Sequence, residues 1–296
     1  MSANANLAEG GTMPAPDRAA EHRRRFGADD RLWVSAGLFT ALALTVGVPL
    51  IVLLLWSVAA RWPAPDLLPR AYAADTWRAV LGDRDLLAAT VNSLWIAIAV
   101  TLLTTALAAP TAWALARFPM RWRRTVELFV LAPVIVPGIV VATGVGLVFQ
   151  VLGLSYTATG VVLVQTVGTL PLAVRLLTAS FEALPDELLH AARSLGAGPA
   201  AVAWHVVLPL SWHGLAAGAL LSFVGSFEEF DKTFIVGAPV VQTLPVLLYH
   251  HLDPYSLQFP LAAATALVLL VPVLVVFVLS GRLLRDDLMA SGMGRL

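Results

Sequence analysis

The residues best suited to act on another molecule lie in one segment, 181–209, between two long apolar stretches. Pro185 suits the first position of a helix, Asp186 and Glu187 sit where the helix dipole favours negative charge, and Gly196 suits a left-handed cap past the end. This spacing predicts a helix of about three turns. A second short helix is predicted to begin at Gly198-Pro199 and to end at Pro209.

One side of the first predicted helix is small and apolar. Leu184, Leu188, Ala191 and Leu195 recur at helical spacing, with Ala192 beside them. Such a face allows another protein to approach closely. The chemistry that we expect from this segment is therefore docking, and we expect no catalytic residue in the chain.

Acidic side chains gather at a second place. Glu228, Glu229 and Asp231 precede Lys232, the only lysine of the sequence. We expect this acidic cluster at the outer end of a membrane span, where it either faces a cationic cargo or a binding protein, or is simply solvated. A P-loop requires Gly-x-x-x-x-Gly-Lys-[Ser/Thr], because its lysine must reach the phosphates of ATP. Lys232 has no such context, so a separate subunit must hydrolyse ATP if ATP is used.

Other site types find little support. His250, His251 and Asp253 are close in sequence, but a metal site needs three or four converging ligands, so we expect none. The hydrolase motifs His-Glu-x-x-His and Gly-x-Ser-x-Gly do not occur. We therefore expect no cofactor in this chain.

Uncharged polar residues within the apolar stretches are candidates for a translocation path. Interhelical hydrogen bonding, worth about 0.6 kcal/mol on average, is the alternative role for each of them. These residues are Asn92, Gln165, Thr166, Thr169 and Ser222. A GxxxG pair, Gly214 and Gly218, predicts close packing of its helix.

The elements that position these residues must lie in a lipid bilayer. The sequence of 296 residues is 58% hydrophobic and only 13% charged, and its mean hydropathy is +0.80. Soluble domains carry about 25% charged residues. An all-α integral membrane protein is therefore expected, because helices satisfy their backbone groups in hydrocarbon.

Six transmembrane helices are expected, each needing roughly 20 residues. The uncharged stretch 128–174 is too long for one crossing and is divided at Gln150 to Thr159, where polar and turn-prone residues interrupt it. The other spans are predicted at 32–60, 86–116, from Ser211 to before Glu228, and 260–280. Residues 1–30 are expected to be a disordered cytoplasmic tail, 31–285 the six-helix transmembrane domain, and 286–296 a cytoplasmic C-terminal tail.

The distribution of basic residues predicts the orientation. Fourteen arginines would lie inside if both termini were cytoplasmic, and five basic residues would lie outside. Because Lys and Arg are retained on the cytoplasmic side, this favours N-in and C-in. Segment 181–209 then becomes the longest internal loop.

Segment 181–209 resembles the EAA loop of ABC importer permeases, whose pattern is Glu-Ala-Ala, three residues, Gly, nine residues, Ile, any residue, Leu-Pro. Every spacing is kept, and the pattern is filled by His190, Ala191, Ala192, Gly196, Val206, Leu208 and Pro209. His190 replaces the glutamate, and Glu187, one turn earlier, is a candidate to supply a carboxylate instead. Further similarity to the branch that includes spermidine/putrescine permeases covers Asn92-Ser93, Ala114 to Arg117, Pro133 to Pro137, Phe227 to Phe230 and Thr243 to Pro245.

The resemblance implies a type I ABC importer permease, a multi-pass protein of a prokaryotic cytoplasmic (inner) membrane. In that family the loop is a coupling helix that docks on an ATPase subunit. The implied partners are two ABC ATPase subunits carrying ATP and Mg, a second permease subunit, a periplasmic or extracellular solute-binding protein and the lipid bilayer, with no nucleic acid. For the second permease, a related heteromeric partner is preferred to a homodimer. A polyamine-like solute is the first expectation for the cargo, and iron(III), thiamine and aminoethylphosphonate are alternatives.

An ion-coupled secondary transporter is the alternative function. Such a protein would normally place ionisable groups in the middle of its spans and show internal repeats. The sequence analysis identifies neither feature, so the ABC permease is preferred.

Overall fold

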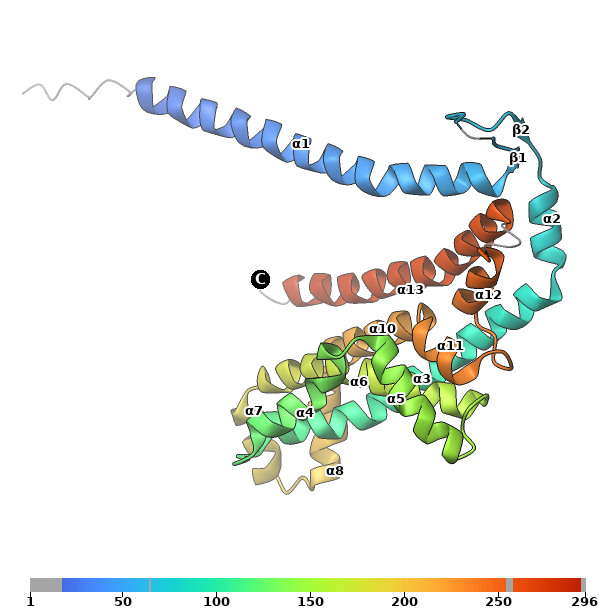
Figure 1. Cartoon of the computed structure of the whole chain (residues 1–296). Coiled ribbons are helices and arrows are strands. Elements are labelled where there is room, and N and C mark those ends of the chain that lie inside the picture. Colours follow the sequence, from blue (N-terminus) through green and yellow to red (C-terminus); the bar gives the residue numbers. More distant parts are fainter. Residues whose placement is uncertain (1–17, 64, 254–257, 294–296) are drawn as a thin grey trace, which may run out of the picture. The chain divides into compact units, whose positions relative to one another are not determined.

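The computed structural model describes residues 18–63, 65–253 and 258–293 (Figure 1). The chain divides into two units, Met1–Val52 and Leu53–Leu296, each of which we describe by itself. Helix α1, Arg18–Ser57, provides the described part of the first unit and ends in the second.

Helix α1 is longer than the first predicted span. Its stretch Trp33–Ser57 is long and apolar enough to cross a membrane. Residues 18–30, assigned from sequence to a disordered tail, form the first turns of α1. This stretch is rich in Ala and Arg, which have high helix propensity, and it continues directly from an apolar helix. Residues 1–17 lie outside the described part of the chain.

The second unit is almost entirely helical. A short antiparallel hairpin of β1 and β2 precedes its first helix. Its elements are β1 Ala59–Arg61, β2 Ala71–Tyr72, α2 Asp75–Gly82, α3 Arg84–Arg117, α4 Arg123–Ile135, α5 Gly138–Val151, α6 Ala158–Glu182, α7 Asp186–Ser194, α8 Pro199–Val202, the π-helix η1 Ala203–Val207, α9 Leu208–Leu210, α10 Trp212–Phe227, α11 Asp231–Gly237, α12 Leu244–His251 and α13 Phe259–Met293.

Across the described residues, four helices are long and apolar enough to cross a membrane, and two bent helix pairs raise the number to six if each pair is one span. The four are α1, α3, α6 and α13. The described helices make up the expected six spans only if α4 with α5, and the stretch Pro199–Leu210 with α10, each form one span.

The third span is not the continuous helix that we predicted. Helices α4 and α5 meet at an angle of 101°. Pro137 has no N–H to continue the helix, and a proline disfavours helical geometry in the residue before it. Val136 accordingly adopts an extended conformation, with ψ of 133°. The fifth span is also interrupted, because the helical stretch Pro199–Leu210 meets α10 at 74°.

The C-terminal helix also continues past its predicted end. Helix α13 reaches Met293, whereas the sixth span was predicted to stop near residue 280 and residues 286–296 were assigned to a tail. Residues 286–293 are therefore helical, and 294–296 lie outside the described residues. The apolar stretch sets the limit of the membrane span but does not set the limit of the helix.

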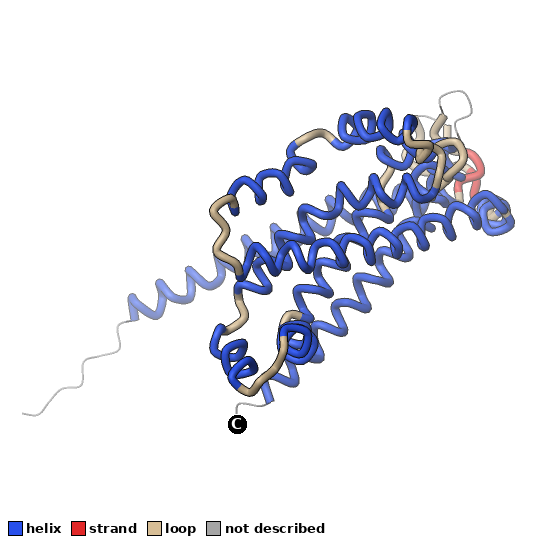
Figure 2. The backbone as a smooth tube through the Cα atoms, turned by 90° about the horizontal axis from the view of Figure 1, so that it is seen from below, coloured by secondary structure: helices blue, strands red, loops and turns tan. Residues whose placement is uncertain are grey.

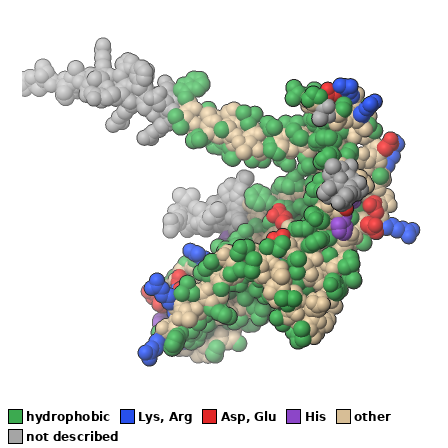
Figure 3. All heavy atoms as spheres, viewed as in Figure 1, with side chains coloured by type: hydrophobic (Ala, Val, Ile, Leu, Met, Phe, Trp, Pro, Cys, Tyr) green, Lys and Arg blue, Asp and Glu red, His purple; other side chains and the backbone are tan. Residues whose placement is uncertain are grey.

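The centre of the second unit is formed by α3, α6 and α10, which pack against one another. Figure 2 shows the long helices lying side by side. Hydrophobic side chains cover much of the visible surface, whereas basic and acidic side chains gather toward the two ends of this unit, with a few acidic ones between (Figure 3). This outward apolar surface suits contact with lipid.

Helices α6 and α10 approach closely at the first glycine of the predicted GxxxG pair. A Cβ atom added at Gly214 would lie 2.3 Å from the Ser180 hydroxyl and 2.4 Å from its Cβ. A Cβ at Gly218 would lie 3.8 Å from Leu177, which is an ordinary contact. Close packing of this helix therefore depends on Gly214.

These two glycines provide a matched test of the packing. Replacing Gly214 by Ala should destabilise the protein by about 1–3 kcal/mol, because the contact with Ser180 would become overpacked. Gly218→Ala should leave the apparent melting temperature of the detergent-purified protein close to that of the wild type. Equal melting temperatures for the two variants would contradict this account of the α6–α10 contact.

Candidate functional site

Helix α7 ends in a well-defined glycine turn. Gly196 has a φ of +84°, the left-handed conformation predicted from the sequence. The N–H of Gly196 donates to the carbonyl of Arg193 at 2.9 Å, and the N–H of Ala197 donates to that of Ala192 at 3.1 Å. This pair of bonds is the Schellman arrangement, which satisfies carbonyl groups at the end of a helix.

One face of α7 packs inward and the other is exposed. Leu189 is buried, whereas Leu188 and Ala191 are exposed and Leu195 is 89% exposed. Leu184, predicted from sequence to share the exposed side, is buried in the core instead. Pro185 separates it from α7, so the helical spacing that relates Leu188, Ala191 and Leu195 does not extend to it. We call these three exposed residues the docking face.

The second arm of the segment also has a buried side. Pro199 begins α8 as predicted, and the helix continues through η1 and α9 as far as Leu210. Val202 and Val207 are buried in the same core as Leu189. Leu208 and Pro209 are exposed. Pro209 has no N–H to donate to the preceding turn, which is consistent with the widened π-helical turn before it.

The remaining residues of the predicted docking loop lie at the surface. Glu187 and His190 are exposed on α7, and Ala192 is half-buried. Ala192 packs against the core that contains Leu189 and Val207. The loop therefore combines a buried side that is continuous with α3 and α6 and an outward side that offers the docking face, Glu187 and His190.

Arg117, which was quoted only for its family resemblance, fastens the start of α7. Its guanidinium lies 2.5 Å from the Asp186 carboxylate and donates to the carbonyls of Phe181 and Leu184, each at 2.6 Å. A basic residue in the last turn of a helix is a recognisable sequence signal. Its partners, more than 60 residues further along the chain, could not be recognised from the sequence.

A second arginine ties α4 to the same end of α6. Arg123 contacts Glu127, four residues further along α4, at 2.8 Å, and Glu182 at 2.5 Å. A cavity of about 370 Å³ opens beside them and is lined by α3, α4 and α6, including Arg175. Ionic contacts thus hold three helices around the beginning of segment 181–209.

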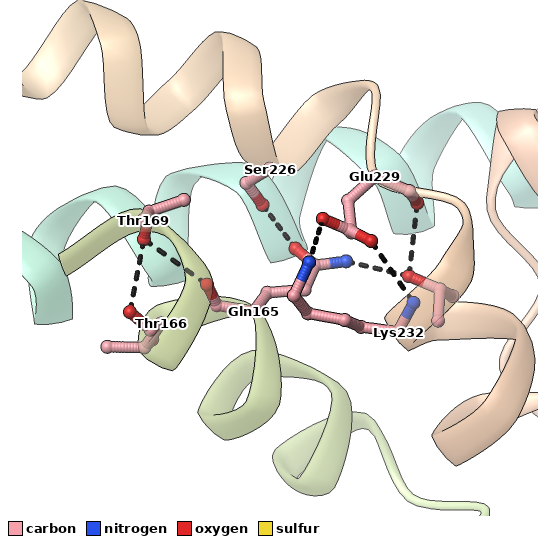
Figure 4. A network of polar contacts seen from close by, with 7 residues as sticks. Gln165, Thr166, Thr169, Ser226, Glu229 and Lys232 are labelled. Carbon is pink, nitrogen blue, oxygen red and sulfur yellow. Dashed lines mark hydrogen bonds and ion pairs between the residues drawn. The ribbon is translucent and has the colours of Figure 1, made fainter. Parts of the chain in front are cut away.

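A polar network lies inside the bundle, with Gln165 at its centre (Figure 4). The Ser226 hydroxyl donates to Gln165 Oε1 at 2.5 Å, and Gln165 Nε2 donates to the Thr233 hydroxyl at 2.7 Å. Lys232 Nζ lies 2.5 Å from Glu229 Oε2, and the Lys232 backbone N–H donates to Glu229 Oε1 at 3.1 Å. The network joins α6, the end of α10 and the start of α11.

The acidic cluster lies where α10 ends, and its lysine packs against α6. Lys232 reaches Gly168, where an added Cβ would be 2.7 Å from Lys232 Cε. Gly168 is ten residues, or about 15 Å, from the start of the 25-residue helix α6. Helix α10 has only 16 residues, and α11 continues along α5 and α6. The cluster therefore follows α10, at the end of the predicted fifth span, in the connection to α11.

The charges of this cluster are not equivalent. The Lys232 and Glu229 side chains are 10% and 18% exposed, and they compensate each other. Glu228 is exposed and Asp231 is half-buried. A Cβ at Gly138, the first residue of α5, would lie 3.4 Å from Asp231 Oδ2, so this carboxylate sits at the positive end of a helix.

The other candidate path residues are placed separately. Asn92 donates to the carbonyl of Gln242 at 2.9 Å and so holds a connection after α11. Thr166 and Ser222 donate to carbonyls of their own helices. Thr166 also lines an apolar cavity of about 580 Å³ between α3, α5 and α6. The Thr169 hydroxyl is within 3.3 Å of the carbonyls of both Gln165 and Thr166, so these three of the eight candidates share the network of Figure 4 with Glu229.

The Glu229–Lys232 pair yields a stability prediction. Glu229→Gln would leave a buried ammonium without its carboxylate, which should cost about 3–5 kcal/mol. The double variant Glu229→Gln with Lys232→Met should recover most of the lost stability. Glu228→Gln, at the exposed neighbour, serves as the control, and apparent melting temperatures of the purified proteins provide the measurement. A single variant as stable as the wild type would show that the pair carries no such energy.

Comparison with known proteins agrees with this fold. Residues 107–286 match the family described as "Binding-protein-dependent transport system inner membrane component". The chain is 32% identical over 225 residues to a Streptomyces antibioticus protein named as an ABC transporter permease protein, ORF1, covering 76% of this chain and 98% of that protein. It is 28% identical over 217 residues to the spermidine/putrescine transport system permease protein PotC of Shigella flexneri, covering 73% and 81% of the two chains.

A solved structure has the same architecture. A chain of a bacterial ABC transporter involved in the import of the acidic polysaccharide alginate superimposes with a TM-score of 0.70 at 19% identity, covering 91% of this chain and 99% of that one. The match shows that the two chains share their overall fold. The chain is a multi-pass membrane protein that belongs to the inner-membrane permease components of binding-protein-dependent ABC transport systems.

Proposed function

We propose that this chain forms part of the translocation path of an ATP-driven importer and that segment 181–209 docks on a separate ATPase subunit. The observation that carries the proposal is the docking face. Leu188, Ala191 and Leu195 are exposed on a short helix whose opposite side is packed into the bundle. Exposed apolar surface of this kind is typical of a protein interaction site.

The attachment of α7 suits the transmission of movement. At one end the segment continues from α6, and at the other it leads into α10, which meets α6 closely at Gly214 and Ser180. Buried Leu189, Val202 and Val207 share a core with α3 and α6. A force applied to the docking face would therefore act on packed membrane helices and would not be absorbed by a flexible loop.

The direction of the chain follows from its basic residues. The end of the bundle that contains α7 carries Arg117, Arg121, Arg123, Arg124 and Arg193. Since basic residues are retained on the cytoplasmic side, this end is assigned to the cytoplasm. The docking face then meets an ATPase on the side of the membrane where ATP is available.

The remaining partners follow from the same proposal. The sequence contains one lysine and no P-loop, so two ATPase subunits with ATP and Mg would supply the energy. One chain offers one segment of this kind, so a second, related permease subunit would face the second ATPase. A solute-binding protein on the opposite side would deliver the cargo, in keeping with the description of the family.

A small hydrophilic solute is the cargo that we propose, without assigning its chemical class. The relatives are named for different cargoes, polyamines in one case and an acidic polysaccharide in another. The initial expectation of a polyamine therefore has no particular support. The ionisable pair within the bundle is a feature of secondary transporters too, but the family to which the chain belongs favours the ATP-driven importer.

Co-purification tests the proposed function directly. The tagged protein, expressed in a prokaryotic host with its own importer partners, should retain an ATPase subunit after solubilisation in mild detergent. Replacing exposed Leu195 by Glu should release that subunit, because a charge would be buried in the contact. A stable protein that transports solute without any ATPase subunit would reject the proposal.

Two glycines of the loop provide a sharper test. A Cβ has open space at both Gly196 and Gly198, but only Gly196 has a positive φ. Gly196→Ala should therefore cost about 1–2 kcal/mol of backbone strain and weaken the cap, and Gly196→Val should abolish ATPase retention. Gly198→Ala should retain the subunit at the wild-type level, with membrane abundance measured alongside. Full retention by Gly196→Val would contradict a role for this turn in docking.

A further inference from the structure

Arg117 crosses the short link between α6 and α7. Helix α6 ends at Glu182 and α7 begins at Asp186, and Pro185 between them has an extended conformation, with ψ of 130°. Bends between rigid elements occur at links of this kind. Arg117, at the end of α3, binds the carbonyls of Phe181 and Leu184 before α7 and the carboxylate of Asp186 within it.

The contacts require the shape of a guanidinium. One terminal nitrogen serves the two carbonyls, and the other serves the carboxylate. The carbonyl groups at the end of a helix lack intrahelical donors, and a cation there complements the helix dipole. A lysine would keep the charge but present one compact ammonium in place of a rigid fork.

The guanidinium is also held by aromatic packing. The Arg117 side chain is 14% exposed, and its Cζ lies 5.8 Å from the centre of the Trp113 ring. Trp113 packs edge-on against Phe181 at 5.5 Å between ring centres. Arg117 Nε is buried with no partner among the described residues. One donor of this arginine is thus unsatisfied, and an unsatisfied buried donor usually costs about 1–3 kcal/mol.

Arg123, the second arginine described above, makes a different kind of contact. Arg123 binds only carboxylates and is 42% exposed, so solvent and salt weaken its pairs. Both of its partners, Glu127 and Glu182, precede the α6–α7 link. Among the ion pairs of the described residues, the one between Arg117 and Asp186 is the pair that joins α7 to another helix.

We propose that Arg117 is a positioning residue that locks the α6–α7 link, so that displacement of the docking face moves α3 together with α6 and α10. This inference rests on the proposed docking function. Without the lock, α7 could tilt about Pro185 and leave α3 in place. Helix α3 packs along α6 and is bonded to it deep in the bundle, where the Thr104 and Thr169 hydroxyls lie 2.7 Å apart. With the link locked, α3 and α6 would therefore move together with α7, and the movement would reach the centre of the bundle.

Spin labels on α3 and α7 can measure this coupling. The sequence contains no cysteine, so labelled cysteines at exposed Leu107 and Ser194 would be the only ones in this chain. The probe is the complex of the tagged protein with its co-purified ATPase subunit, examined without nucleotide and after trapping with ATP and vanadate. In the otherwise unchanged protein, the distance distribution between the labels should stay narrow and keep its mean in both states.

Two variants should loosen α7. With Arg117→Lys, the distribution should broaden and its mean should shift on trapping, while ATP hydrolysis continues. Asp186→Asn removes the carboxylate charge and so weakens only the attachment to α7. It changes a side chain that is 71% exposed, so it should give a shift in the same direction with little loss of thermal stability. Arg121→Lys, at an exposed arginine four residues beyond Arg117, is the matched control and should behave like the unchanged protein.

The outcomes separate the two proposals. If Arg117→Lys and Asp186→Asn both keep a narrow, nucleotide-independent distance, the lock is rejected and Arg117 contributes charge alone. If Arg117→Lys fails to fold, Asp186→Asn decides the question by itself. If the unchanged protein retains no ATPase subunit, the docking function fails, and this result is obtained before any variant is compared.

Discussion

Polar groups within this bundle have to find partners in the chain itself, since a bilayer core offers no water to bind them. The network around Gln165 follows from this constraint: a buried amide is bonded at both ends, to Ser226 and Thr233. Glu229 and Lys232 satisfy each other in the same region. Where α10 ends, the freed polar groups are thus gathered against α6 and paired there.

The same constraint operates at the end of α6, where the chain leaves the bundle. Carbonyls that no longer have helical donors are bound by Arg117, and Gly196 allows the end of α7 to satisfy its own carbonyls. Satisfying the backbone in this way also makes the segment stiff. Stiffness is the property required of a part that must pass a force from one protein to the helices of another.

Much of this arrangement could be predicted from local sequence signals. The apolar stretches predicted the number of spans, and the positions of Pro185, Gly196 and Pro199 predicted the two short helices and the turn between them. These features depend on residues within a few positions of one another. The bend at Val136-Pro137 was also encoded locally. The apolar stretch from residue 128 to Gln150 was nevertheless interpreted as one continuous helix, because hydropathy carries no information on the direction of the chain.

Features that depend on distant partners could not be derived. The position of the acidic cluster is set by the end of α10 and by the packing of α11 on α5 and α6. The partners of Arg117 lie on another helix and its connection. The sequence analysis also did not predict that α1 and α13 extend beyond their apolar stretches. The reason is different here, because membrane thickness limits the length of an apolar stretch and sets no limit on helix length.

The buried position of Lys232 has a practical consequence for anyone who wishes to modify this protein. It is the only lysine in the sequence, and it is 8% exposed. Reagents that attach dyes, cross-linkers or solid supports through primary amines would find no accessible lysine in the folded chain. Amine coupling would therefore not attach the folded protein through a lysine, and carboxylate- or tag-directed attachment offers the better-placed groups.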